Sequence, residues 1–219
     1  MSGEVQRRLR LHDMSERNSE KLTTRWIWRF LSWAERFQMR RDRVFNYTLA
    51  AAWGVEVGPG CQFFGRVSFE RQLGSIIRIG PQCRFRSRGT SNRIGINRPC
   101  MISTLFPGAA ILIGQRVGMS GTIVAAAQSI VIGDDVLCGA NVTITDTDWH
   151  GIRPDDRRKA GPSAPVVIEN NVWLGLNVVL LKGVTIGENS IVSAGSVVNR
   201  SIPPNVIAGG MPAAPIKPL

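Results

Sequence analysis

The second half of the chain places an aliphatic residue at every sixth position. A second row of aliphatic or small residues runs four positions behind the first. Because an amphipathic helix repeats near 3.6 residues and a half-buried strand about every 2, this longer period predicts short strands separated by corners. Three such strands close one triangular coil, and coils stacked about 4.8 Å apart bury one continuous row. The row consists of Ile168, Leu174, Leu180, Ile186, Val192 and Val198.

The same pattern extends towards the N-terminus with less regular spacing. We expect the inward row to continue there with one spacing of seven residues in place of six. Further upstream the spacings are irregular, which predicts loops or bulges at the corners. Residues 55–219 are therefore predicted to form one parallel β-helix. The expected inward positions are Ile113, Met119, Ala125, Ile132, Cys138 and Ile144, and weaker pieces lie at Val57-Gly58, Ile79-Gly80 and Ile94-Gly95.

Residues 1–54 have a different character and are predicted to form a basic tail followed by an amphipathic helix. Residues 1–24 are polar without periodicity, whereas the next stretch places four aromatic side chains on one helical face and arginines over much of the rest. Two interpretations stay open: the aromatic face covers the open first coil, or the helix lies on an anionic membrane surface. The aromatic residues are Trp26, Phe30, Trp33 and Phe37.

Composition narrows the class of protein. With 219 residues and 43% hydrophobic content, the chain can bury a sizeable core as one main domain with an appendage. It has no apolar run long enough for a membrane span and no signal-peptide pattern, so we expect a cytoplasmic protein, with peripheral contact at the inner membrane face as an alternative. The net charge of +11 invites anionic partners, but no nucleic-acid-binding motif accompanies it. The four cysteines show no CxxC pairing and are interpreted as small buried residues.

A polar segment interrupts the regular coils between residues 146 and 166. Nothing in it keeps the inward row, so we expect a loop extruded from the coil, and a long loop in such a regular fold is usually functional. His150 is the only histidine of the repeat domain and follows Asp148 by two residues. An imidazole whose tautomer is set by a carboxylate suits a general base, although a merely solvated histidine is the simpler alternative. Either Asp148 or Asp146 could orient it.

Several phrases together resemble one family, the left-handed parallel β-helix acyltransferases with hexapeptide repeats. The similarity is greatest to the branch of maltose, galactoside, nodulation and exopolysaccharide O-acetyltransferases, and it covers about residues 55–217. The phrases are Ile132-Gly-Asp-Asp-Val, Gly139-Ala-Asn-Val-Thr-Ile, Asp146-Thr-Asp-Trp-His, Val172-Trp-Leu-Gly-Leu, Gly183-Val-Thr-Ile-Gly, Ser193-Ala-Gly-Ser-Val-Val, Ile202-Pro-Pro-Asn and Gly209-Gly-Met-Pro-Ala.

The resemblance implies a left-handed coil, a homotrimer, and acetyl-CoA bound between neighbouring coils without any metal. It assigns His150 as general base with Asp148 beside it, and the Gly175 N–H is our candidate donor to the oxyanion. Met119 and Ala127 stand where the sugar acetyltransferases keep polar residues, which argues against maltose or galactoside as acceptor. The implied acceptor-binding residues are Trp173, Asn141 and Met119, and the implied cofactor-binding residues are Gly175, Leu176, Ala194, Asn199, Arg200 and Lys217.

Three alternative functions share parts of this pattern. A γ-type carbonic anhydrase shares the coil but needs three histidine ligands, and the chain has only two histidines. A non-catalytic β-helix scaffold, or an N-acetyltransferase of an amino sugar or another small molecule, stays open. The prediction is an acetyl-CoA-dependent O-acetyltransferase acting on a sugar hydroxyl, in a surface polysaccharide or its precursor.

Overall fold

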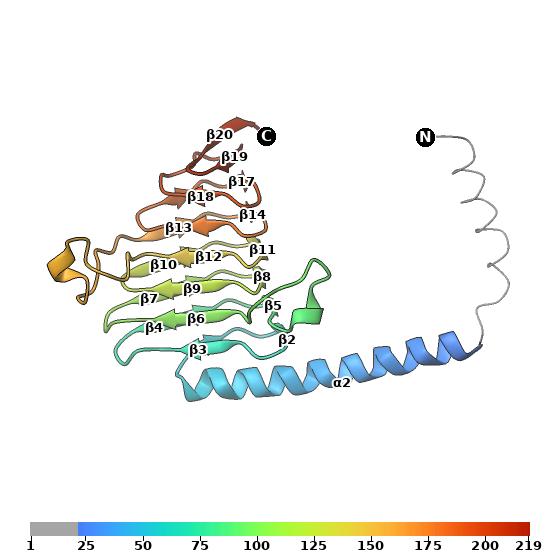
Figure 1. Cartoon of the computed structure of the whole chain (residues 1–219). Helices are drawn as coiled ribbons and strands as arrows, with labels where there is room; N and C mark the ends of the chain where they lie inside the picture. The colour runs from blue at the N-terminus through green and yellow to red at the C-terminus, as the bar shows by residue number, and fades with distance from the viewer. Residues whose placement is uncertain (1–21) are drawn as a thin grey trace, which may run out of the picture. The chain divides into compact units, whose positions relative to one another are not determined.

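The computed structural model describes residues 22–219, which form one long helix followed by a three-sided solenoid (Figure 1). Helix α2 runs from Leu22 to Ala52. The chain divides within this helix into two compact units, one ending at Arg40 and the other spanning 41–219. Most of the expected polar tail lies outside the described residues. Within the described part of the chain, no helix is both long and apolar enough to span a bilayer.

The solenoid consists of three sheets, and every strand but the last runs parallel to its neighbours. Sheet A contains β1 (Glu56–Val57), β4 (Ile76–Ile79), β7 (Ala110–Ile113), β10 (Ser129–Ile132), β13 (Val166–Ile168) and β16 (Thr185–Ile186). Sheet B contains β2 (Gln62–Phe64), β5 (Arg84–Arg86), β8 (Gly118–Ser120), β11 (Leu137–Ala140), β14 (Trp173–Leu174), β17 (Ile191–Val192), β19 (Val206–Gly210) and β20 (Ala213–Pro218). Sheet C contains β3 (Ser68–Glu70), β6 (Met101–Thr104), β9 (Ile123–Ala126), β12 (Thr143–Thr145), β15 (Val179–Leu180) and β18 (Val197–Val198).

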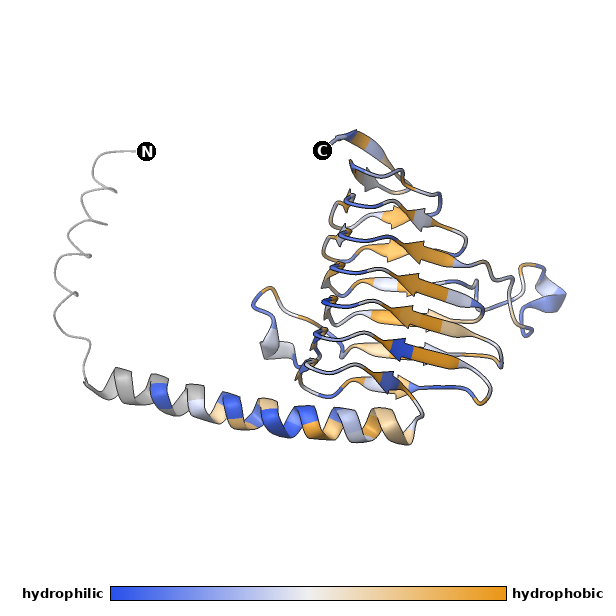
Figure 2. Cartoon of the chain, turned by 180° about the vertical axis from the view of Figure 1, so that it is seen from behind, coloured by the Kyte–Doolittle hydropathy of each residue, from blue (hydrophilic) through white to orange (hydrophobic). Residues whose placement is uncertain are grey.

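The period-six row forms the core, as predicted. Its members from Ile168 to Val198 are fully buried, and equivalent positions pair in register from coil to coil, as Ile132 does with Ile168. Figure 2 shows the coil strands as mainly hydrophobic and the loops as mainly hydrophilic. One expected position is wrong, because Val124 and not Ala125 pairs with Ile144.

The four cysteines are free thiols buried in the coil, which confirms their interpretation as small core residues. Burial raises the pKa of the Cys138 thiol to about 12, so this side chain stays protonated and behaves as an apolar group.

The end of helix α2 caps the first coil through polar side chains. The Val67 N–H donates to Asn46 Oδ1 at 2.8 Å, and Asn46 Nδ2 donates to the Gly65 carbonyl at 3.1 Å. The Gly65 N–H in turn donates to Asp42 Oδ2 at 2.9 Å. The next residue, Tyr47, acts in the same way, since its hydroxyl accepts from the Cys61 N–H and donates to the Gly58 carbonyl. These contacts satisfy backbone groups that have no preceding coil to pair with.

The part of the helix that caps the coil is thus residues 42–47, whereas the four aromatic residues belong to the unit that ends at Arg40, so an aromatic cap stays a prediction. Trp33 and Phe37 stack on each other with centroids 6.1 Å apart, and their side chains are 63% and 61% exposed.

Two loops leave the coil at different corners, and a hairpin closes its far end. The expected loop emerges between β12 and β13, spans residues 146–165 and includes the 3₁₀ turn η2 (Pro154–Asp156). A second loop, residues 87–100 with η1 (Gly89–Ser91), links β5 to β6. At the C-terminus, β20 folds back antiparallel on β19 and covers the last edge of sheet B. The hairpin has no signal in the hexapeptide pattern.

We predict that Asn46→Ala lowers the free energy of unfolding by about 2–4 kcal/mol, because a buried N–H and a buried carbonyl lose their partner. Urea denaturation followed by circular dichroism measures the change. Thr48→Ala is the matched control, since Thr48 is exposed on the same helix and should change stability by less than about 0.5 kcal/mol. Equal stability of the two variants would refute the polar cap.

Candidate functional site

The 146–165 loop is anchored by Asp146, which is fully buried. Its carboxylate accepts the backbone N–H groups of Ala127, Gln128 and Ser129 at 2.6–2.8 Å. These donors lie at the same corner in the preceding coil, so the carboxylate joins the loop to the coil beneath it. Asp146 therefore anchors the start of the loop, and its carboxylate oxygens bind backbone N–H groups and not the His150 imidazole.

His150 lies exposed near the start of the loop. Its Nδ1 is 3.0 Å from the carbonyl oxygen of Arg157, and its backbone N–H donates to the Asp148 carbonyl at 2.7 Å. Because a carbonyl oxygen can only accept, the contact requires a proton on Nδ1 and leaves Nε2 of the neutral ring as the free base. The partner that sets the tautomer is thus a backbone carbonyl.

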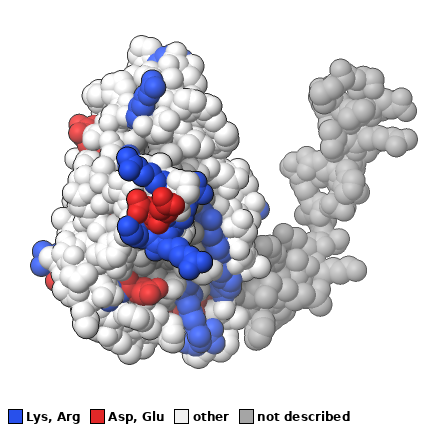
Figure 3. All heavy atoms as spheres, turned by 60° about the vertical axis from the view of Figure 1, so that its left-hand side comes forward, with Lys and Arg blue, Asp and Glu red and all other residues white. Residues whose placement is uncertain are grey.

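The Asp148 carboxylate faces Lys182, whose Nζ lies 2.6 Å from both of its oxygens. Lys182 follows β15 in the next coil. This half-buried ion pair therefore joins the loop to the following coil, whereas Asp146 joins it to the preceding one. Asp148, His150 and Arg157 still line one surface hollow. The loop surface that surrounds this hollow gathers lysine and arginine side chains with acidic ones among them (Figure 3).

Most other expected residues lie on the outer face of sheet B or at the corner that follows it. Trp173 pairs in register with Leu137 below and Ile191 above, and its side chain is 51% exposed. Ala194 stands exposed at the same corner one coil above Gly175. Lys217 extends this face at the far end, where it pairs with Ile207.

Gly175 has a packing role. A Cβ on it would lie 2.6 Å from the Ala194 backbone nitrogen, so only glycine lets the two corners stack. Its N–H donates to the Val192 carbonyl at 2.8 Å and is therefore unavailable to an oxyanion, which corrects our expectation. The neighbouring Leu176 N–H makes no hydrogen bond within the described residues, and Leu176 is half-buried. It replaces Gly175 as the candidate donor.

Two expected acceptor residues are engaged elsewhere. Met119 is 1% exposed and belongs to the core, because the alternation of β8 turns its side chain inwards and turns Gly118 and Ser120 outwards. Asn141 Oδ1 accepts the Asn97 N–H at 3.1 Å, so its side chain anchors the 87–100 loop.

Asn199 and Arg200 lie exposed at the corner from sheet C to sheet A, which is also the corner of the His150 loop. Neither Arg200 nor Lys217 forms an ion pair within the described part of the chain. The expected site residues thus form two groups at different corners of the triangle: His150, Asp148, Asn199 and Arg200 at one, and Trp173, Gly175, Leu176, Ala194, Asn141 and Lys217 on or beside sheet B (Figure 1).

Comparisons with known proteins support the fold and the type of domain. Residues 165–200 match the family described as bacterial transferase hexapeptide (six repeats). Galactoside O-acetyltransferase of Escherichia coli is 46% identical over 90 residues, which are 41% of this chain and 44% of the relative. The putative lipopolysaccharide biosynthesis O-acetyl transferase WbbJ of the same species is 40% identical over 104 residues, 43% of this chain and 53% of the relative. The chain thus spans about half the length of these relatives.

A solved structure agrees in fold. A point mutant of AntD, an N-acyltransferase from Bacillus cereus in complex with dTDP-4-amino-4,6-dideoxyglucose and coenzyme A, aligns with a TM-score of 0.58 over 78% of this chain and 88% of that chain, at 18% identity. This likeness concerns the arrangement of the coils. Together, the repeat and the shared fold identify a hexapeptide-repeat domain with the left-handed parallel β-helix fold, and residues 165–200 are similar to the bacterial hexapeptide transferases.

Proposed function

We propose that the protein is an acetyl-CoA-dependent O-acetyltransferase that acetylates a sugar hydroxyl in a surface polysaccharide or its precursor. The observation that carries this proposal is the exposed His150, held by the Arg157 carbonyl with Nε2 free, on a loop extruded from a hexapeptide coil. The relatives named as galactoside and lipopolysaccharide O-acetyltransferases support the reaction type.

His150 performs the proton transfer. Its Nε2 accepts the proton of the acceptor hydroxyl as that oxygen attacks the acetyl carbonyl carbon, and returns the proton to the departing sulfur. Acetyl-CoA supplies an activated thioester, so positioning and deprotonation contribute much of the rate without a covalent enzyme intermediate. The Leu176 N–H is the candidate donor to the oxyanion that forms on the carbonyl oxygen.

The outer face of sheet B fits the cofactor. Ala194 and Gly175 keep the corner low enough for a pantetheine chain to pass close to the backbone, and the exposed Trp173 offers an apolar wall beside it. Lys217 on this face, and Arg200 at the corner of the His150 loop, carry the positive charges that phosphate groups require. Among the described residues, no group of three metal-ligating side chains lies together.

A complete site requires a second subunit. The His150 loop and the outer face of sheet B lie at different corners of one rigid coil, so one chain alone does not bring them together. A homotrimer in which the loop corner of one subunit faces sheet B of the next combines both halves in a heterologous, closed interface. Each of three equivalent sites then draws residues from two chains.

The N-terminal part of helix α2 suits an anionic membrane surface. Trp33 and Phe37 are exposed and stacked, and the exposed Arg36 and Arg40 lie on the same stretch of helix. An apolar aromatic pair with neighbouring arginines is typical of peripheral helices at the headgroup boundary. Such contact would place the enzyme beside a lipid-linked glycan at the inner membrane face.

We predict that His150→Ala lowers turnover by roughly 10²–10⁴ while acetyl-CoA affinity, measured by calorimetry, stays near that of the parent protein. Asp155→Ala is the matched control, because it changes a charge on the same loop without touching the histidine. Unchanged turnover of His150→Ala would remove the proposed base. Absence of acetyl-CoA binding to the parent protein would favour a scaffold instead.

We predict that two inactive variants complement each other. Ala194→Tyr blocks the cofactor groove and His150→Ala removes the base, so neither homotrimer is active. Trimers from equal co-expression of both should regain about a quarter of parental activity, because each site takes His150 from one chain and Ala194 from its neighbour. No activity in the mixed trimers would show that one chain supplies both residues.

We predict that the double substitution Trp33→Ser and Phe37→Ser reduces co-sedimentation with vesicles containing anionic phosphatidylglycerol at least about fivefold. Val44→Ser is the control, since Val44 is an exposed apolar residue of the same helix. Neutral phosphatidylcholine vesicles show whether charge contributes. Equal sedimentation of parent and double variant would exclude the aromatic pair as the membrane contact.

A further inference from the structure

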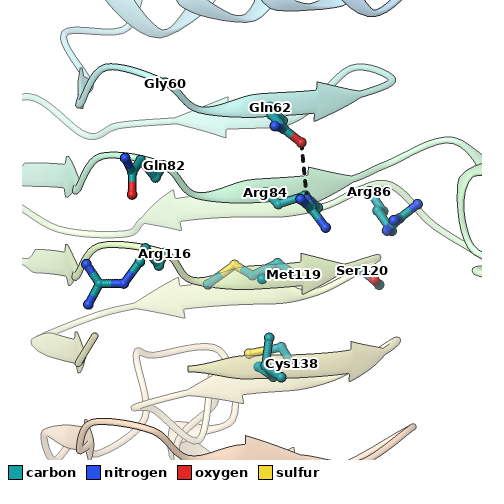
Figure 4. Close-up of a pocket in the computed structure, with 11 residues that line it drawn as sticks. Gly60, Gln62, Gln82, Arg84, Arg86, Arg116, Met119, Ser120 and Cys138 are labelled. Carbon is teal, nitrogen blue, oxygen red and sulfur yellow. Dashed lines mark hydrogen bonds between the residues drawn. The ribbon is translucent and has the colours of Figure 1, made fainter. Parts of the chain in front are cut away.

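A second hollow lies on the outer face of sheet B, below Trp173 and away from the His150 loop. Its volume is about 660 Å³, and strands β2, β5, β8 and β11 form its floor (Figure 4). Gly118 pairs with Arg84 of the preceding coil and with Leu137 of the following coil. Gly118 carries no side chain, and the Leu137 side chain leans over it, since a Cβ at Gly118 would lie 3.1 Å from Leu137 Cδ2.

The walls of this hollow are strongly basic. Figure 4 shows Arg84, Arg86 and Arg116 around it. Arg116 is neutralised by Asp135, whose two carboxylate oxygens accept from its Nε and one Nη at 2.7 and 2.6 Å. Arg84 and Arg86 have no carboxylate partner within the described residues.

The contacts of Arg84 and Arg86 hold them in place and leave their charge uncompensated. Arg84 Nε donates to Gln62 Oε1 at 3.2 Å. Arg86 donates to the Ser91 carbonyl of the 87–100 loop and lies over the Phe64 ring, 4.7 Å from its centroid. Each guanidinium has five donor hydrogens, so most remain for a ligand. Ser120 adds a hydroxyl to the same wall.

We infer that this hollow binds an anionic group of the acceptor, so that the acceptor is a charged sugar and not a neutral one. Two adjacent guanidinium groups without acidic partners recognise phosphate or carboxylate oxygens through paired N–H donors. A glycosyl phosphate and a uronic acid share this chemistry. The inference rests on the proposed transferase function, because it takes the hollow as the acceptor end of the same site.

The position of the hollow agrees with this role. Arg84, Gly118, Leu137 and Trp173 occupy successive coils in one register column. Three coil steps of about 4.8 Å place Arg84 roughly 14 Å below Trp173. An arginine side chain spans part of this distance, and one hexose with its anionic substituent spans the rest. The anion then lies at the basic end and a free hydroxyl lies towards the acetyl group.

The test measures binding of small probes to the full chain saturated with coenzyme A, so that the phosphate sites of the cofactor are filled. Methyl glucoside, glucose 1-phosphate and glucuronate are compared by ligand-observed NMR, with galactose and mannose counterparts. We expect at least one charged sugar to bind about tenfold or more tightly than its neutral counterpart. Preference for the 1-phosphate indicates a glycosyl phosphate acceptor, and preference for the uronate indicates an acidic sugar.

Substitutions of the arginines test whether these side chains cause the preference for charged over neutral sugars. Arg84→Gln alone, and with Arg86→Gln, should reduce the ratio of charged to neutral affinity towards one, whereas Arg78→Gln on sheet A should keep it. Arg78 is an exposed arginine paired with Glu56, one strand before Arg84. Size-exclusion chromatography of each variant monitors assembly.

Several results would overturn the inference. They are equal affinity for charged and neutral sugars, absence of binding by every charged sugar, retention of selectivity in the double variant, and dissociation of the assembly in Arg84→Gln. The last would assign Arg84 to a subunit contact. Coenzyme A binding separates the hypotheses, because its absence refutes the transferase function, whereas its presence with no charge preference refutes only the anionic acceptor.

Discussion

The whole solenoid depends on the backbone ladder that joins each coil to the next. Every strand of a coil pairs in parallel with the equivalent strands above and below, and the register of one pair is passed to the following pair. Side chains therefore form straight columns, inward ones in the core and outward ones on the three faces. The ladder leaves unpaired groups only at its ends. Asp42, Asn46 and Tyr47 satisfy them at the first coil, and the antiparallel strand β20 covers the last edge of sheet B.

The same ladder determines where functional segments can be inserted. Extra residues inside a strand interrupt its pairing, as the one-residue register shift between β8 and β11 does, whereas extra residues at a corner leave the ladder intact. Both long loops accordingly leave at corners, and each is tied back by a side chain that makes several hydrogen bonds. Asp146 accepts three N–H groups at one corner. Arg98 donates to the Gly121 and Asn141 carbonyls and to the Thr143 hydroxyl at the other. A loop held in this way can keep His150 in a defined orientation, which a free loop of about 20 residues could not.

The repeat made the fold predictable because its period is set by local geometry that every coil shares. The inward row and the extruded loop around His150 follow directly from that pattern. The contacts that the two loops make could not be predicted from the repeat, because the loops do not follow its period. The Arg157 carbonyl beside His150 depends on how the loop folds on itself, and the 87–100 loop falls where the pattern was only irregular. Met119 was expected both in the inward row and at the acceptor, and its burial confirms the inward position, although the hollow on sheet B reaches down to its strand. The Gly175 N–H was predicted to bind the oxyanion, whereas the close approach of the Ala194 backbone explains why this position requires glycine.

The inward and outward positions of the same strands have different roles: the inward ones stabilise the fold, and the outward ones form the surface that a ligand would contact. Inward positions and stacked corner glycines have no room to change, since a Cβ at Gly175 meets the backbone of the next coil. Outward positions of sheet B lie on the surface of the solenoid and can change at small cost to folding, typically within about 0.5 kcal/mol. Arg84, Gly118 and Trp173 share one such outward column, with charge at one end, a glycine in the middle and an aromatic ring at the other. Because the coil spacing holds these features at constant separations, replacing single outward residues can alter which ligand fits without moving the loop that carries His150.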